Sequence, residues 1–118
     1  DKGTANKEAR DVLATLHNPH IALFATAGVP PQMAHAKESL INAANCLPDG
    51  VEPVGTFICQ GKVDPKVIEM MYKMFPKGHS HGQSADRDAR HKQAAEHPNE
   101  DDCKAAQDFA KDILIKLG

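Results

Sequence analysis

The residues best suited to contact a ligand form a short loop of small residues, Thr26-Ala27-Gly28-Val29, directly after the apolar run Ile21–Ala25. Such a run is typical of a strand that is buried on both faces of a parallel sheet. Ligands of open α/β sheets bind beyond the carboxyl ends of the strands. Gly28 has no Cβ and can adopt a positive φ, so the loop backbone can approach a flat ligand closely. The same residues also fit a plain connection between a strand and a helix.

Histidines give the second candidate chemistry, which is metal binding. His79 and His81 are separated by one residue, and His91 and His97 follow downstream. Structural zinc sites usually include cysteines and have tighter spacing, so a solvated polar loop before a charged helix is the simpler interpretation. We expect His91 and His97 to be exposed on a polar helix. His35 faces either the small-residue loop or solvent, and we favour solvent.

Cysteines offer little catalytic potential. Cys46, Cys59 and Cys103 are too isolated to form a disulfide framework, which indicates reduced thiols in a cytoplasmic protein. Cys59 lies late in an expected strand and is predicted to be a small buried hydrophobic residue. Cys103 lies near the start of the final helix, where the dipole favours a thiolate, but Asp101 and Asp102 beside it oppose that effect. We assign no catalytic nucleophile.

Length and composition narrow the class of protein further. The chain has 118 residues, 25% of them charged, and a formal net charge of −2. That balance gives no electrostatic footprint for nucleic acid. No apolar run approaches the roughly 20 residues that a membrane span requires. The sequence starts at Asp1 without a methionine, so we expect a chain that was cut or is incomplete upstream.

Apolar periodicity and capping residues predict alternating helices and strands. The expected elements are a helix over 5–16 capped by Thr4, a strand over 20–26, a helix over 32–46, a strand over 51–59, a helix beginning at Asp64-Pro65, a polar helix over 84–96 and a helix over 100–117. Two strands separated by a helix indicate a parallel βαβ unit. Buried parallel strands need neighbours, so we predict part of a doubly wound α/β domain over 1–118, with 77–98 as an irregular and polar helical insertion.

Four stretches of the chain carry a family resemblance, namely residues 1–5, 20–28, 55–65 and 96–102. The most specific one reads Gly-Thr-Phe-Ile-Cys-Gln-Gly-Lys-Val-Asp-Pro from Gly55 to Pro65. Together they resemble the second half of flavodoxin-family proteins, in the bacterial single-domain group that includes the flavodoxin-like partners of bilirubin reductases. The resemblance implies a flavodoxin-like doubly wound parallel sheet, of which this chain holds only the last two strands and their helices.

The resemblance also implies a cofactor and a role. FMN is expected at the carboxyl ends of the strands, and the protein is expected to carry electrons to a redox partner protein rather than to catalyse a reaction of its own. Three groups of residues correspond by position to flavin contacts: Asp1, Lys2, Gly3 and Thr4 beside the flavin ring, Thr26, Ala27, Gly28 and Val29 at its pyrimidine edge, and Gln60 and Gly61 near the same rim.

The chain departs from the family pattern in one large respect. The Ser/Thr-rich phosphate loop and the first three strands of the family are absent, and no Gly- or Ser/Thr-rich turn here replaces that loop. We therefore expect this chain alone to hold FMN weakly, and expect a missing amino-terminal half or a homo-oligomer to complete the sheet. The alternative is a non-enzymatic α/β interaction module whose His-bearing loop binds a metal or a partner chain.

Overall fold

The computed structural model describes residues 3–79 and 82–118. These residues form two strands and five helices in the predicted order, with boundaries that differ by a few residues. The elements are α1 (Lys7–Leu13), β1 (Ala22–Ala27), α2 (Ala34–Ala44), β2 (Gly55–Gln60), α3 (Pro65–Met74), α4 (Ala85–Ala94) and α5 (Glu100–Leu117). The predicted α/β organisation is confirmed.

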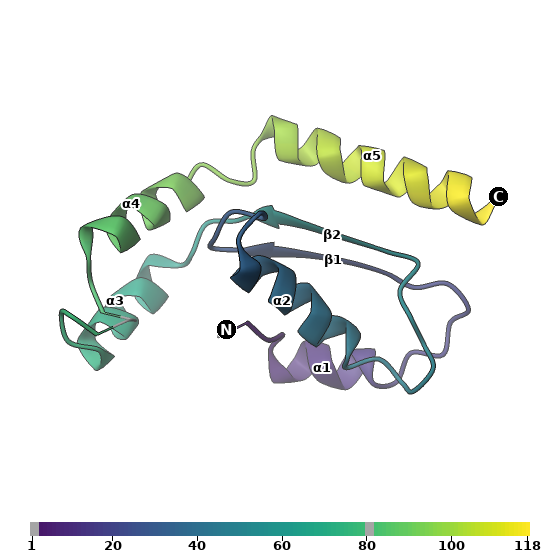
Figure 1. The fold of residues 1–118 in the computed structure, drawn as a ribbon, viewed down its shortest axis with the longest axis horizontal. Helices are drawn as coiled ribbons and strands as arrows, with labels where there is room; N and C mark the ends of the chain where they lie inside the picture. Colours follow the sequence, from purple (N-terminus) through teal and green to yellow (C-terminus); the bar gives the residue numbers. More distant parts are fainter. Residues whose placement is uncertain (1–2, 80–81) are drawn as a thin grey trace.

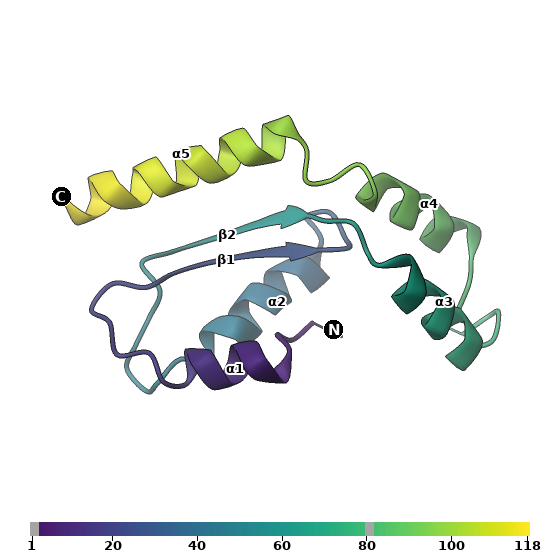
Figure 2. The ribbon, with the colours of Figure 1, turned by 180° about the vertical axis from the view of Figure 1, so that it is seen from behind.

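The two strands pair in parallel, with Ala22 opposite Gly55 and Ala27 opposite Gln60. Helices α1 and α2 lie on one side of the strands and α5 lies on the other, as Figures 1 and 2 show from opposite directions. Helices α3 and α4 lie beyond the carboxyl ends of the strands (Figure 1). Because parallel strands end at the same edge, the segments that leave β1 and β2 start side by side.

A small core lies between β1 and the helices on the α2 side. It is centred on Ile21, Leu23 and Leu47, with partly buried Leu13, Leu16, Ala43, Ala44 and Val51 packed around it. Within the described residues no large side chain is fully buried. The radius of gyration is 16.0 Å, compared with about 13.5 Å for a compact domain of this length. This part of the chain is therefore open and has little interior.

Burial of β1 on both faces, which the apolar run predicted, is wrong for the described residues. Phe24 is 80% exposed. Its register partner on β2, Phe57, stacks on Phe109 of α5 with ring centroids 5.6 Å apart. Helix α5 thus covers β2 and leaves the same face of β1 open. Within the described residues β1 pairs only with β2, so its other edge has no strand partner.

Side-chain caps fix where α1, α3, α4 and α5 begin, whereas α2 has none. Asn6, not the predicted Thr4, caps α1, because its Oδ1 accepts a hydrogen bond of 2.8 Å from the Ala9 N–H. Helix α1 is consequently shorter than predicted. Asp64 caps α3 and Asn99 caps α5, as the sequence indicated. These caps satisfy N–H groups that have no partner within the helix itself.

The start of β2 sets the distance between the sheet and α5. The strand begins at Gly55 rather than Val51, because Pro53 has no N–H with which to extend the ladder. A Cβ on Gly55 would lie 2.5 Å from Cδ1 of Ile113 and 3.2 Å from the ring of Phe109. Glycine is therefore required here so that α5 can approach the strand closely.

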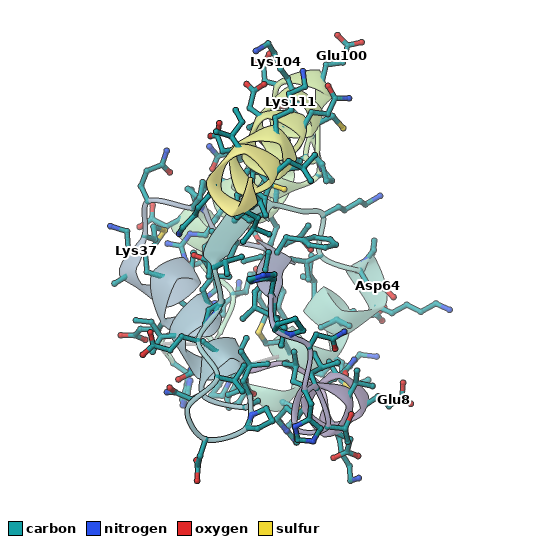
Figure 3. The ribbon with its side chains drawn as sticks, turned by 90° about the vertical axis from the view of Figure 1, so that its right-hand side faces the viewer. Glu8, Lys37, Asp64, Glu100, Lys104 and Lys111 are labelled. Carbon is teal, nitrogen blue, oxygen red and sulfur yellow. The ribbon has the colours of Figure 1, made fainter. Side chains whose placement is uncertain are left out.

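Helix α5 is less buried than its apolar stripe predicted. Ala106, Phe109 and Ile113 are half-buried, but Leu114 and Ile115 are 70% and 78% exposed. No helix in the described ranges combines the length and apolar composition needed to cross a membrane. Charged side chains lie at the outer surface in Figure 3, which labels Glu8, Lys37, Asp64, Glu100, Lys104 and Lys111.

The contact at Gly55 predicts a specific stability effect. Gly55→Ala should lower the free energy of unfolding by about 1–3 kcal/mol, because the new methyl group overlaps Ile113. The double variant Gly55→Ala/Ile113→Val removes the overlapping Cδ1 and should recover part of that loss. Urea denaturation of the wild type, both single variants and the double variant measures the coupling. Strictly additive losses would show that the two groups do not compete for space.

Candidate functional site

A cleft of about 500 Å³ lies at the carboxyl ends of the two strands. The segment 3–5 and the loop 26–29 line one part of it, and α3 and α4 line another. This is the edge at which open α/β sheets bind ligands. The structure therefore brings the two predicted flavin-contacting loops together, as far as they are described. Asp1 and Lys2, which were predicted to belong to the first of them, lie outside the described residues.

Two residues at the carboxyl end of β2 support the loop 26–29. Gln60 is 3% exposed, and its Nε2 donates a hydrogen bond of 3.2 Å to the carbonyl of Gly28. The Gly61 N–H donates a bond of 2.8 Å to the carbonyl of Ala27. Neither Gln60 nor Gly61 lines the cleft. In this structure both position the loop, and direct contact of either residue with a cofactor stays a prediction.

Gly28 is needed for space rather than for a left-handed backbone. Its φ lies outside the positive region that favours glycine, unlike the expectation from the sequence. A Cβ at Gly28 would lie 2.5 Å from Cγ2 of Val63, in the segment that leads from β2 to α3. Any larger side chain must therefore shift this loop or its neighbour.

The segment 3–5 is anchored by α2. Asn42 Nδ2 donates a hydrogen bond of 2.7 Å to the carbonyl of Gly3, whose φ of +76° does require glycine. The His35 ring lies 3.2 Å from the place of a Cβ on Gly3. His35 is exposed, as we favoured, but it also lines the cleft beside the segment that holds Gly3 and Thr4.

A hydrogen-bonded cluster joins α3 to α4. The Tyr72 Oη lies 3.1 Å from Asp88 Oδ1 and 3.1 Å from His91 Nδ1. Burial, with the nearby Arg87 charge second, lowers the pKa of His91 and favours its neutral form. Burial and the bond to Asp88 raise the pKa of Tyr72. The neutral tyrosine donates to the carboxylate and accepts from the imidazole.

The expectation that His91 is exposed is wrong, and the sequence held a signal for its burial. Half-buried or buried residues of α4 recur at Arg87, Arg90, His91 and Ala94, which is helical spacing. Because most of those residues are polar, composition alone predicts little inward face for this helix. The packing of Tyr72 against this side decides its orientation.

His97, which was also expected to be exposed, is half-buried. It lies where the segment that contains α3 and α4 returns to the sheet. Its Nδ1 lies 2.6 Å from Asp102 Oδ2, and its carbonyl accepts a 3.0 Å hydrogen bond from the Lys62 N–H. Both side chains of the pair are about four-fifths covered. The bond from His97, followed by that from the Asn99 N–H, lowers the pKa of Asp102. His97 thus ties the end of β2 to the start of α5.

The spacing of the histidines suggested a candidate metal site, but the described residues do not form one. His79 stacks on Phe75 with ring centroids 4.7 Å apart, and His81 lies outside the described residues. Among residues 3–79 and 82–118 no three His, Cys, Asp or Glu side chains gather closely enough to hold a metal ion. Cys59 is buried, as predicted, and burial raises the pKa of its thiol.

Comparison with known sequences identifies the family. The sequence profile of the flavodoxin domain matches residues 1–111. The chain belongs to the flavodoxin domain family. The family resemblance of the sequence and the flavodoxin-like fold class are thereby confirmed.

Two curated flavodoxin-family relatives are similar over most of the chain. The flavodoxin-like domain-containing protein BilS of Clostridioides difficile (strain CD3) is 32% identical over 120 residues, which cover 98% of this chain and 66% of that protein. The protein of the same name from Clostridium symbiosum (strain WAL-14163) is 31% identical over 115 residues, covering 92% of this chain and 60% of that protein. The chain therefore spans less than two thirds of the length of these relatives.

The His97–Asp102 pair predicts an acid-sensitive contribution to stability. Because the pKa of Asp102 is lower in the folded protein than its ordinary value of 3.8, the ionised carboxylate stabilises the folded state at pH values above 3.8. This contribution is lost as the pH falls through the folded-state pKa. Asp102→Asn should therefore destabilise the protein at pH 7 and reduce the loss of stability below about pH 4. Chemical denaturation across pH 2–7 measures both effects.

Asp101→Asn is the matched control, because Asp101 is exposed and lies in the same first turn of α5. Its pH profile should follow that of the wild type. If Asp102→Asn and Asp101→Asn gave the same profile, the bond between His97 and Asp102 would contribute nothing specific.

Proposed function

We propose that this chain is part of an FMN-dependent electron-transfer protein, with the flavin ring in the cleft between the segment 3–5 and the loop 26–29. The observation that carries the proposal is the cleft itself, at the carboxyl ends of two parallel strands and lined by both loops. Membership of the flavodoxin domain family supports the choice of FMN. The bound flavin supplies the redox chemistry, and the protein supplies orientation and electrostatics.

The lining of the cleft suits a flat, largely apolar ring. Its volume of about 500 Å³ lies in the usual range for small-molecule sites. Met70, Met71 and Met74 of α3 line one wall, and methionine side chains adapt to the shape of a ligand. The space that Gly28 leaves beside Val63 lets the loop 26–29 pack against the segment that leads from β2 to α3, and both residues line the cleft.

The proposal leaves two tasks to parts outside this sequence. The described residues contain no Ser/Thr-rich turn at a strand end that could form a phosphate loop, so we assign the main grip on the FMN phosphate to another segment of the protein. Electron transfer also needs a redox partner protein. The acidic first turn of α5 with Glu100, Asp101 and Asp102 is one surface that can steer a basic partner.

FMN binding and the role of Gly28 can be tested together. FMN titrated into the complete protein should give a bound oxidised flavin spectrum. Gly28→Ala should weaken FMN binding about tenfold or more, the equivalent of about 1.4 kcal/mol or more, because the added methyl group overlaps Val63 and displaces the loop. Circular dichroism checks that the variant is folded.

Gly50→Ala serves as the control for this titration. Gly50 also has a special backbone conformation, with a φ of +80°, but it has open space around it and does not line the cleft. Its variant should lose stability without losing flavin affinity. A complete protein that binds no FMN would reject the proposal and favour the interaction-module alternative.

We also propose that a β-strand from a segment outside this sequence pairs with the free edge of β1. An apolar groove of about 580 Å³ runs beside that edge, between β1 and α1, and its lining includes Val12, Leu23 and Phe24. The length of the BilS relatives, of which this chain covers 66% and 60%, supports the presence of further segments. A paired strand would also satisfy the exposed ladder groups.

Phe24 reports whether the sheet is completed. In the complete protein Phe24→Ala should lower the free energy of unfolding by about 3–5 kcal/mol, the usual cost at a buried position. Leu114→Ala, at a similarly exposed residue of α5, is the control and should cost within about 0.5 kcal/mol. Equal small effects would contradict the proposal. Stability that rises with protein concentration would instead indicate a homo-oligomer.

We propose a cytoplasmic location on the basis of thiol chemistry. Cys46, Cys59 and Cys103 all carry free thiols in the described structure. Unpaired cysteines are usual in reducing compartments.

A further inference from the structure

The side of α4 that faces the cleft carries two arginines and a histidine where a packed helix normally carries apolar side chains. Arg87, Arg90 and His91 are half-buried on that side and line the cleft, whereas Lys92 on the same helix is exposed. Only Ala94 contributes a buried apolar residue to α4. An amphipathic helix usually buries its apolar stripe and exposes its charges, so α4 has the reverse arrangement.

The orientation of α4 is fixed by specific contacts. Tyr72 of α3 hydrogen-bonds to both Asp88 and His91, and its ring lies 5.9 Å from the His91 ring. At the end of α4, His97 is held by Asp102 and by the Lys62 N–H. These contacts hold the side with Arg87 and Arg90 toward the cleft, which the loop 26–29 also lines. Helix α4 itself lies beyond the strand ends (Figure 1).

The positive charge of Arg90 has no carboxylate partner among the described residues that line the cleft. None of the described residues that line the cleft is acidic. Asp88 is engaged with Tyr72 and with the side-chain amide of Gln83. In residues 3–79 and 82–118 no ion pair involves Arg90. A partly desolvated guanidinium without a carboxylate gains most from an anionic ligand that enters the cleft.

We propose that Arg90 binds an oxyanion of a small molecule in this cleft, either a phosphate or a carboxylate group. The planar guanidinium fork matches both groups. The neighbouring methionine side chains of α3 would contact the apolar part of the same molecule. The inference rests on the proposed function for one possible source of the anion, the phosphate of FMN; the other source is a second small molecule.

The first arm of the test compares flavins that differ in one phosphate group. FMN and riboflavin are titrated into the complete wild-type protein, Arg90→Gln and Lys92→Gln. Lys92→Gln removes the same charge from the exposed side of the same helix, so it controls for net charge. If the anion is the FMN phosphate, Arg90→Gln should lower the affinity for FMN about tenfold and leave the affinity for riboflavin unchanged. A tenfold loss is the scale of one charge-assisted hydrogen bond.

The second arm needs no flavin. Inorganic phosphate and benzoate are titrated separately into the same proteins, and backbone amide shifts of α4 are followed by NMR. If the anion belongs to a second molecule, wild type and Lys92→Gln should show saturable shifts that Arg90→Gln weakens about tenfold. A protein that binds neither flavin refutes the proposed function, and this second arm then decides the present inference alone.

Two results overturn the inference. In the first, Arg90→Gln leaves every affinity in both arms at the wild-type level. In the second, Arg90→Gln weakens riboflavin binding as much as FMN binding, and the second arm shows no anion binding. The latter result assigns Arg90 to the shape of the cleft. If Arg90→Gln does not fold by circular dichroism, Arg90→Lys replaces it. That variant keeps the charge but loses the fork, and it should bind the anion more weakly than wild type.

Discussion

Backbone hydrogen bonds between β1 and β2 hold the two strands in a parallel register in which Ala27 lies opposite Gln60. The loops at the strand ends, which form one part of the cleft, depend on that alignment. It places the buried amide of Gln60 under the carbonyl of Gly28, and it brings the segment that leaves β2 against the loop that leaves β1. A shift of one residue would turn each side chain to the opposite face of the sheet and separate these partners.

Local signals in the sequence predict the order of the helices and strands, but they do not predict which of their residues are buried. Asp64 and Asn99 marked two helix starts correctly, because capping is a matter of a few neighbouring residues. The prediction of Thr4 as the cap of α1 was wrong, since Asn6 can cap as well and only the path of the chain decides between them. The exposure of Phe24 was also missed, because burial depends on which elements lie across a strand and an apolar run does not contain that information.

In the candidate site, too, features set by neighbouring residues could be predicted, and features set by distant contacts could not. The loop 26–29 and Gly28 were predicted as the ligand edge, since small residues after an apolar strand are a local pattern. The supporting role of Gln60 depends on a partner 32 positions away in sequence, which spacing alone does not reveal. The inward side of α4 was missed because Arg90 and His91 resemble surface residues in composition. Their helical spacing was visible, but only the contact with Tyr72 shows which side faces inward.

The hydrogen bond between the Lys62 N–H and the His97 carbonyl has a consequence for how this part of the family can change. The chain leaves the sheet and returns to it at one point, so the segment between these residues forms an excursion closed at its base. Lengthening a closed loop adds an entropic cost that grows only with the logarithm of its length. Because that cost grows slowly, the segment with α3 and α4 can be replaced, shortened or extended as one unit while β2 and α5 keep their places. Changes in this one segment would then alter which ligands the cleft accepts, while the core between β1 and α2 stays the same.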